Sequence, residues 1–277
     1  MVDRVCISIN NRCNLNCKYC HFHEKSEFIE KANMDVIEIL DNIITYINEK
    51  KIELFKIGFV GNGEPLLEYK ELQRYILYIS DYLKSGRIAA YTITNGILVN
   101  REMLEFFKSY NVNLGFSIDG LASIHDQYRC GTHDKVIEKI ELYKEVFGNY
   151  PSMNCTVGAE TLEKAEETIS YFKKYDAKIT FSRMIGKYGI SLESFNNFLN
   201  TASKHLNVRR GGYDCTMYGG KCGAGMNNFF FANGKVFLCG NCVDLPALAD
   251  SCETLDNLDK VTLDFDRKHC YKESLCE

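Results

Sequence analysis

The order of apolar and polar positions divides most of the chain into short β-rich runs and longer helical segments. The β-rich runs predict strands at residues 4–10, 54–60, 88–94, 112–118, 152–157 and 178–184. Segments with apolar residues three and four positions apart predict helices at residues 34–50, 66–83, 101–109, 135–147 and 162–174. Strands and helices therefore alternate from residue 4 to about residue 185.

This alternation predicts an α/β fold with parallel strands and right-handed crossovers. The six predicted strands are too few for the full eightfold barrel. We therefore expect an open, partial (β/α)6 TIM-like barrel, with its chemistry at the C-terminal ends of the strands. A doubly wound sheet is the alternative, because periodicity alone does not separate the two folds.

Composition excludes several classes of protein. The chain has 277 residues, of which 45% are hydrophobic and 25% charged, as in an ordinary globular protein with a sizeable core. The net charge of -4 gives no electrostatic reason to expect nucleic acid or an anionic membrane as a partner. No apolar run has the length of a membrane span. An apolar strand pattern begins at residue 4, which leaves no room for a signal peptide, so we expect a cytoplasmic protein.

The thirteen cysteines are unusual for such a protein. In a reducing compartment, clustered cysteines indicate metal binding or catalysis more often than disulfides. Seven of them lie in the last quarter of the chain: Cys215, Cys222, Cys239, Cys242, Cys252, Cys270 and Cys276. With the paired glycines Gly211-Gly212 and Gly219-Gly220, this shift predicts a barrel domain over residues 1–207 and a small cysteine-rich domain over residues 208–277.

Three more cysteines, Cys13, Cys17 and Cys20, follow the first predicted strand. Three thiolates on so short a loop can converge on one metal centre. A structural zinc ion or an ordinary cubane iron–sulfur cluster takes four protein ligands, so three leave one metal site open to another molecule. The alternatives are a zinc site completed by His21 or His23, or three unrelated buried thiols.

The other unusual segments also follow predicted strands. Gly61-Asn62-Gly63-Glu64-Pro65 follows the second, Thr94-Asn95-Gly96 ends the third and Ser117-Ile118-Asp119-Gly120 ends the fourth. All lie on the face where a barrel places its site. Each also has a plain structural interpretation: tight turns for the first two, helix capping for Asp119, and a surface ion pair for the downstream Arg129.

Taken together, these residues offer a consistent set of binding groups. The glycines let the backbone approach a ligand closely, and Glu64 can accept a hydrogen bond from an amine. Ser117 and Asp119 lie on one side of a strand end and suit the two hydroxyls of a ribose. The Arg129 guanidinium can hold a carboxylate. An amino acid joined to a nucleoside, such as S-adenosylmethionine (SAM), satisfies all of them.

With these motifs the chain resembles the radical SAM superfamily, and specifically its members with a C-terminal SPASM or twitch domain. The resemblance implies that Cys13, Cys17 and Cys20 ligate a [4Fe-4S] cluster and that SAM chelates its fourth iron. Reductive cleavage of SAM would yield a 5'-deoxyadenosyl radical that abstracts hydrogen from a substrate. By position, the cofactor-binding residues would be Tyr19 near the adenine, Gly61, Gly63 and Glu64 at the amine, Arg129 at the carboxylate, Ser117 and Asp119 at the ribose, and Asn95.

The C-terminal quarter resembles the opening of a SPASM or twitch domain. Asn233-Gly234 predicts a hairpin turn between apolar runs, with Cys222 and Cys239 at the two bases of the hairpin. Cys215 can supply a third ligand, whereas Arg267 stands where the family pattern has a further cysteine.

The seven cysteines support at least one auxiliary [4Fe-4S] cluster, and a second one stays open. A zinc site at Cys239 and Cys242 is the alternative. A cysteine that ligates nothing could instead donate a hydrogen atom to the substrate radical.

Most SPASM and twitch members modify peptides or proteins, so the resemblance favours a maturase of a ribosomally made precursor peptide, which forms a crosslink or epimerises residues. A reductant such as flavodoxin or ferredoxin would supply electrons. A small-molecule dehydrogenase of the twitch type is one alternative. A sulfatase-maturating enzyme is another, although Gly240 follows Cys239 where those enzymes carry an aspartate. An iron–sulfur electron carrier or sensor is the alternative without enzyme activity; it would not need the SAM-binding residues.

Overall fold

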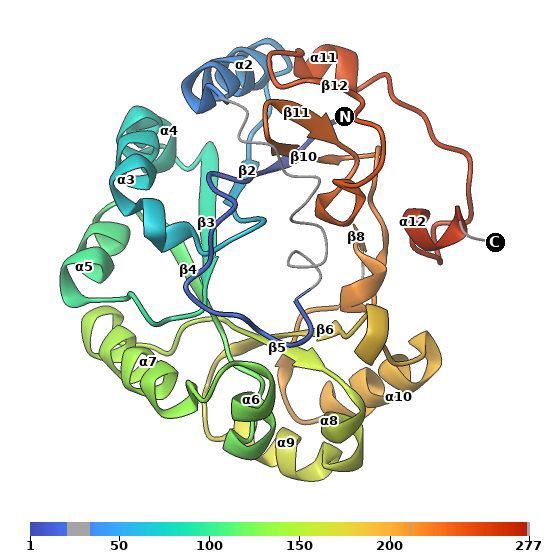
Figure 1. The fold of residues 1–277 in the computed structure, drawn as a ribbon. Coiled ribbons are helices and arrows are strands. Elements are labelled where there is room, and N and C mark those ends of the chain that lie inside the picture. Colours follow the sequence, from blue (N-terminus) through green and yellow to red (C-terminus); the bar gives the residue numbers. More distant parts are fainter. Residues whose placement is uncertain (21–33, 211, 276–277) are drawn as a thin grey trace.

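The computed structural model describes residues 1–20, 34–210 and 212–275. At its centre lie six parallel strands in sequential order (Figure 1). They are β1 (Arg4–Ile7), β2 (Phe55–Phe59), β3 (Ile88–Thr94), β4 (Asn113–Ser117), β5 (Met153–Val157) and β6 (Lys178–Arg183). In a doubly wound sheet the strand order reverses at a switch point, and here it does not. The partial barrel is confirmed, and the predicted strands are all present.

Helices surround the strands on the outside, as the ribbon shows (Figure 1). They are α2 (Val36–Glu49), α3 (Tyr69–Tyr78), α4 (Ser80–Lys84), α5 (Arg101–Ser109), α6 (Ala122–Tyr128), α7 (His133–Phe147), α8 (Ala159–Glu163), α9 (Ala165–Lys173) and α10 (Leu192–Ala202). The prediction was wrong in two respects. The helices expected at 66–83 and 162–174 are broken, the first at Ile79 and the second at Lys164, where the backbone leaves the helical region. Helices α6 and α10 were not expected.

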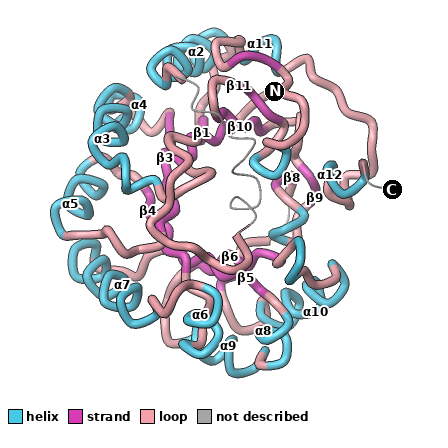
Figure 2. The backbone as a smooth tube through the Cα atoms, in the orientation of Figure 1, coloured by secondary structure: helices cyan, strands magenta, loops and turns pink. Residues whose placement is uncertain are grey.

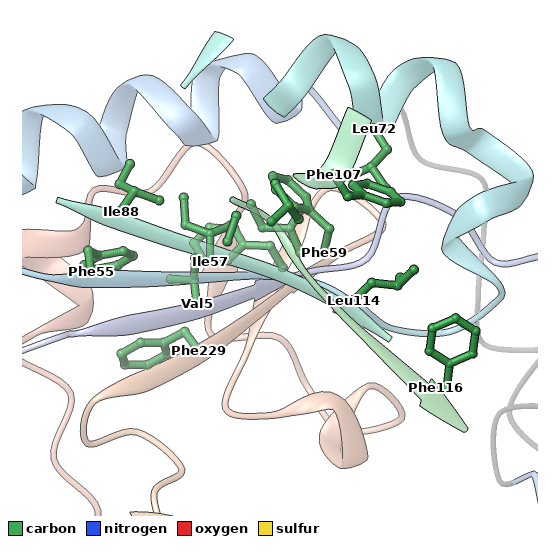
Figure 3. Packing of buried hydrophobic residues seen from close by; sticks show 14 of the residues in the cluster. Val5, Phe55, Ile57, Phe59, Leu72, Ile88, Phe107, Leu114, Phe116 and Phe229 are labelled. Carbon is green, nitrogen blue, oxygen red and sulfur yellow. The ribbon is translucent and has the colours of Figure 1, made fainter. Parts of the chain in front are cut away.

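The strands present alternate residues to the helices and to the barrel interior. Phe55, Ile57 and Phe59 of β2 are fully buried and pack with Leu72 of α3 and Phe107 of α5 on the outer side of the sheet (Figure 3). Burying one such side chain contributes about 1.5–3 kcal/mol. This apolar layer lies on the outer side of the sheet, so the interior positions of the strands can carry polar groups.

The C-terminal region extends the same sheet. Its hairpin consists of β10 (Asn228–Ala232) and β11 (Lys235–Phe237), joined by the predicted Asn233-Gly234 turn, in which both residues have positive φ. Strand β10 pairs in parallel with β1, so the sheet continues across the predicted boundary near residue 208 (Figure 2).

Short elements complete this region: β7 (Asn207–Val208), β8 (Tyr213–Asp214), β9 (Lys221–Cys222), β12 (Ala249–Asp250), α11 (Leu255–Leu258) and α12 (Tyr271–Ser274). In the described parts of the chain, no helix is both long and apolar enough to cross a membrane.

Candidate active site

The loop with Cys13, Cys17 and Cys20 leaves β1 and is anchored first to the turn after β2. The Glu64 N–H donates to the Arg12 carbonyl at 2.8 Å, and Asn10 Nδ2 donates to the Glu64 carbonyl at 2.8 Å. A Cβ on Gly63 would lie 2.1 Å from the Arg12 carbonyl oxygen, and one on Gly61 would lie 2.5 Å from Ser8 Cβ. These two glycines therefore let the turn approach the cysteine loop itself.

The other end of the loop is anchored across the barrel mouth. The Lys18 N–H donates to the Tyr128 carbonyl at 2.9 Å, and the Tyr19 hydroxyl donates to Asp119 Oδ2 at 2.6 Å. The rings of Tyr19 and Tyr128 lie 5.6 Å apart. The three cysteines are thus suspended between the ends of β2 and β4.

The three thiols lie close enough to influence one another. Burial raises the pKa of Cys17 to about 12, with Arg129 lowering it and Cys20 and Cys13 raising it further. Burial also raises the pKa of Cys13, against a hydrogen bond from the Leu15 N–H. Three neighbouring thiolates are therefore unfavourable unless a cation compensates them, and an iron–sulfur cluster ligated by thiolates supplies that charge. The donor set fits such a cluster. His21 and His23, the alternative ligands for zinc, lie outside the described residues.

Glu64 is 2% exposed, and its carboxylate accepts hydrogen bonds from three groups of the protein. The Thr94 hydroxyl donates to Oε1 at 2.7 Å and the Asn95 N–H to Oε2 at 2.8 Å. The Leu66 N–H donates to Oε1 at 3.1 Å. Because a carboxylate has about four acceptor positions, about one stays open for the predicted amine. Burial raises the pKa of Glu64, and these donors lower it.

Asn95 connects the end of β3 to the cysteine loop. Its Nδ2 donates to Asn14 Oδ1 at 2.8 Å and lies 3.9 Å from Cys13 Sγ. Its Oδ1 accepts from the Ile97 N–H at 3.1 Å. Asn95 therefore sits beside the candidate cluster ligands, where its amide can fix the loop.

Asp119 and Arg129 form a buried ion pair next to the loop. Asp119 is 1% exposed, and its Oδ2 accepts from Arg129 Nε at 2.8 Å as well as from Tyr19. Its Oδ1 accepts from the Thr156 N–H at 2.9 Å. Burial lowers the pKa of Arg129, but Asp119, Tyr19 and Cys17 raise it by more. Among the residues that the structure describes, only Nε of Arg129 takes part in the ion pair, which leaves the two terminal nitrogens of the guanidinium for a carboxylate.

Ser117 and Asp119, the predicted ribose acceptors, lie together at the end of β4, but they differ in how far the protein already uses their oxygens. Ser117 is half-buried there, whereas both oxygens of Asp119 already accept hydrogen bonds from the protein. The Thr94 hydroxyl and the Thr156 N–H, which donate to Glu64 and Asp119, were not among the predicted site groups. A threonine at the end of a strand carries no pattern that marks it as a donor to a distant carboxylate.

The C-terminal thiols gather in a second group. Cys239 and Cys270 both raise the pKa values of Cys215, Cys222 and Cys242, in addition to burial. The Sγ atoms of Cys239 and Cys242 are 3.4 Å apart. We call these five residues the C-terminal thiol group.

Cys252 and Cys276 are the remaining predicted metal ligands. Cys252 is exposed, unlike the buried Cys222, Cys242 and Cys270 of the C-terminal thiol group. Cys276 lies outside the described residues. Within the ranges that the structure describes, no three His, Cys, Asp or Glu side chains are arranged as ligands of a single metal ion.

Comparison with known proteins agrees with this geometry. Residues 7–172, more than half of the chain, match the family model of the Radical SAM superfamily. The chain is 26% identical to a cysteine-type anaerobic sulfatase-maturating enzyme of Clostridium novyi, over 69% of this chain and 56% of that protein. It is 25% identical to the radical SAM cyclopropyl synthase TigE of Paramaledivibacter caminithermalis, over 91% of this chain and 61% of that protein.

Solved structures show the same fold at lower identity. Native anSMEcpe with bound AdoMet superposes with a TM-score of 0.74 at 20% identity, covering 94% of this chain and 81% of that one. Streptococcus suis SuiB bound to S-adenosylmethionine has a TM-score of 0.70 at 16% identity, and the match covers 94% of this chain and 63% of that one. The chain spans little more than half the length of some curated relatives, as with the sulfatase-maturating enzyme of C. novyi.

A partial barrel with three cysteines suspended across its mouth defines a class of enzymes that work with an iron–sulfur cluster and SAM. The chain belongs to the radical SAM superfamily. Enzymes of this superfamily use a [4Fe-4S] cluster together with SAM, and the relatives of the sulfatase-maturating type carry auxiliary clusters.

Proposed function

We propose that the protein is a radical SAM enzyme that modifies a peptide. The observation that carries the proposal is the position of the loop with Cys13, Cys17 and Cys20, which hydrogen bonds hold beside the buried Asp119–Arg129 pair. Three thiolates with one cationic side chain in the same pocket suit a cluster whose fourth iron takes an amino acid.

The cofactors supply the difficult chemistry, since the reduced cluster and SAM together generate a carbon radical that removes hydrogen from a substrate. The protein positions and encloses these groups. Arg129 would hold the carboxylate of SAM through its terminal nitrogens, and Glu64 its amine through the remaining acceptor position. Ser117 would contact the ribose. Tyr19, whose ring packs near Tyr128, would cover the adenine.

The substrate would enter the barrel interior, which is polar on one side. Ser117, Asn154, Thr156 and Ser182 are half-buried residues in β4, β5 and β6. Their neighbours Phe116 and Phe181 are fully buried against the rings of Tyr143 and Phe172 on the helix side. Because successive strand residues point to opposite faces, the four polar side chains line the interior. Uncharged hydroxyl and amide groups of this kind suit the backbone of a peptide.

Relatives support a peptide as substrate. One structural neighbour is anSMEcpe with bound AdoMet and the Cp18Cys peptide, and TigE is named as a cyclopropyl synthase. A ribosomally made precursor is the form of peptide that we propose here, with flavodoxin or ferredoxin as reductant. The bond that is made stays open among a crosslink, an epimerisation and a sulfatase-type oxidation.

The C-terminal thiol group would hold an auxiliary [4Fe-4S] cluster. A cubane takes four cysteines, and this group contains five. Since the group has one thiol more than a cubane needs and the Sγ atoms of Cys239 and Cys242 are 3.4 Å apart, either of these two would supply one ligand. Cys215, Cys222 and Cys270 would supply the other three.

The experiment is anaerobic reconstitution of the protein with iron and sulfide, reduction, and addition of SAM. Formation of 5'-deoxyadenosine is expected from the wild type and not from a Cys17→Ala variant. No deoxyadenosine from the reconstituted wild type would overturn the enzyme proposal, and equal amounts from both would overturn the site.

A second experiment tests the substrate. Candidate precursor peptides are incubated with the active enzyme, and their mass is measured in ordinary and in deuterated water. Loss of two hydrogens supports a crosslink or an oxidation, and uptake of one solvent deuteron supports epimerisation. Consumption of SAM with a small alcohol or amine, and with none of the peptides, would favour the dehydrogenase.

A further inference from the structure

His125 on α6 is fully buried, and in the sequence it lies between Asp119 and Arg129, the two members of the ion pair. Its Nδ1 accepts a hydrogen bond from the Asp119 backbone N–H at 3.2 Å. Its Nε2 lies 3.1 Å from the Thr132 hydroxyl. The imidazole therefore connects the end of β4 to the loop that follows α6.

Thr132 continues this connection to Arg129. Its hydroxyl donates to the Arg129 carbonyl at 2.7 Å, and the Arg129 N–H donates to the His125 carbonyl at 2.7 Å. Between Arg129 and Thr132 the chain turns through Cys130 and Gly131, both of which have positive φ. The turn thus brings Thr132 back onto the ring of His125 and fixes the backbone of Arg129 on both sides.

The directions of these bonds determine the state of the ring. The single hydroxyl proton of Thr132 goes to the Arg129 carbonyl, so Nε2 of His125 must be the donor to Thr132. Nδ1 then carries no proton and can accept from Asp119. Protonation of Nδ1 would place two donors face to face. In agreement, burial lowers the pKa of His125 to about 4, despite the nearby Asp119.

We propose that His125 and Thr132 are positioning residues that set the geometry of Arg129 and Asp119 for SAM. They fix the backbone of both ion-pair members, while the side chains of Asp119 and Arg129 hold Tyr19 and face the pocket of Cys17. The inference rests on the proposed function, because it assigns the guanidinium to the carboxylate of SAM. Loss of the connection lets the guanidinium turn and weakens SAM binding, while the three cysteines stay in place.

The test compares Thr132→Val with Thr132→Ser. Valine keeps the shape and removes the hydroxyl, whereas serine keeps the hydroxyl. Each protein is reconstituted anaerobically, its iron content is measured, and SAM is titrated while the electron paramagnetic resonance signal of the reduced cluster is followed. We expect Thr132→Val to bind SAM about tenfold more weakly, the effect of one buried hydrogen bond. Thr132→Ser should bind SAM within about twofold of the wild type.

His133→Phe is the matched control. His133 is also a buried histidine, and its ring lies 5.6 Å from that of His125, but it bonds to Asp134 and Tyr171. We expect the SAM affinity of His133→Phe to be that of the wild type. His125→Gln, which removes the Nδ1 acceptor, should weaken SAM binding and leave the iron content unchanged. In this variant the KM for SAM should rise by a larger factor than kcat falls.

The outcomes separate this inference from the proposed function. If the wild type shows no SAM-dependent change in its spectrum, both fail. If the wild type binds SAM and Thr132→Val binds it equally well, the positioning role alone is overturned. If Thr132→Ser weakens SAM binding as much as Thr132→Val does, His125 and Thr132 act through packing and the inference is wrong. The same holds if the iron content falls in proportion to the SAM affinity.

Discussion

The two cysteine-rich regions of the molecule are held by different means. Cys13, Cys17 and Cys20 lie on a loop whose two ends are fixed by hydrogen bonds to the turn after β2 and to the region after β4. In the C-terminal thiol group, Cys222, Cys242 and Cys270 are buried, and the thiols lie close enough to raise one another's pKa values. The first region depends on distant strands of the barrel and opens to its mouth. The second brings together cysteines from β9, from the segment after β11 and from the start of α12, and it is more deeply buried.

This difference explains what each region can do. A set of only three ligands, of which Cys13 is exposed, leaves space for a second molecule at the metal, as the chemistry of SAM requires. An enclosed set of four or more protects a cluster from solvent and suits storage or transfer of electrons.

Replacing one cysteine in each region should give unequal losses. Cys17→Ala removes one of only three ligands, so 5'-deoxyadenosine formation is expected to fall to background. Cys222→Ala disturbs only the auxiliary site and should retain a measurable rate of SAM cleavage. Both rates are measured by chromatography and mass spectrometry after reconstitution. Complete loss in both variants would show that the two regions are not independent.

Cys239 and Cys242 should each be able to replace the other as a ligand of the auxiliary cluster. If they share one coordination position, each single alanine variant keeps its auxiliary iron, whereas the double variant loses about four irons per chain. Iron and sulfide analysis with Mössbauer spectroscopy measures the difference. A single variant that loses the auxiliary cluster by itself would identify that cysteine as an irreplaceable ligand.

Glycines in the two regions should differ in their tolerance of a methyl group. Gly63→Ala would place Cβ 2.1 Å from the Arg12 carbonyl oxygen, whereas in Gly240→Ala the nearest atom is a ring carbon of Phe230 at 3.4 Å. We expect the first to lower the free energy of unfolding by about 1–3 kcal/mol and the second to change it little. Chemical denaturation measures both. An equal response would mean that the turn after β2 can move away from the loop.

Removing the Tyr19 hydroxyl should have the smallest effect. Tyr19→Phe deletes the donor to Asp119 Oδ2, but Arg129 still bonds to the same oxygen. A loss of about 0.5–1.5 kcal/mol in the free energy of unfolding is expected. Thermal unfolding provides the measurement, with Tyr128→Phe as control, because its hydroxyl donates to Glu160 outside the ion pair. A larger loss than this would give the Tyr19 bond a greater part in holding the loop.

The sequence predicted the barrel well because its signals are local. Alternating runs define β1 to β6, and the position of the cysteine loop, Glu64 and Asp119 after successive strands follows from that order. The donors around these carboxylates could not be predicted. Thr94 and Thr156 reach Glu64 and Asp119 only after strands far apart in sequence have paired. The broken helices were missed because single residues such as Ile79 leave the helical region without any proline or glycine signal.

The parallel pairing of β1 with β10 has a consequence for biosynthesis. Arg4 aligns with Asn228, so one edge of β1 cannot be covered until more than two hundred further residues have been made. An uncovered strand edge is a site of aggregation, and a contact of such long range forms slowly. The region of Cys13, Cys17 and Cys20 therefore reaches its final support late. Insertion of iron into a fully supported loop would therefore follow the synthesis of β10, and release of the chain before that point would expose the edge of β1 to other chains.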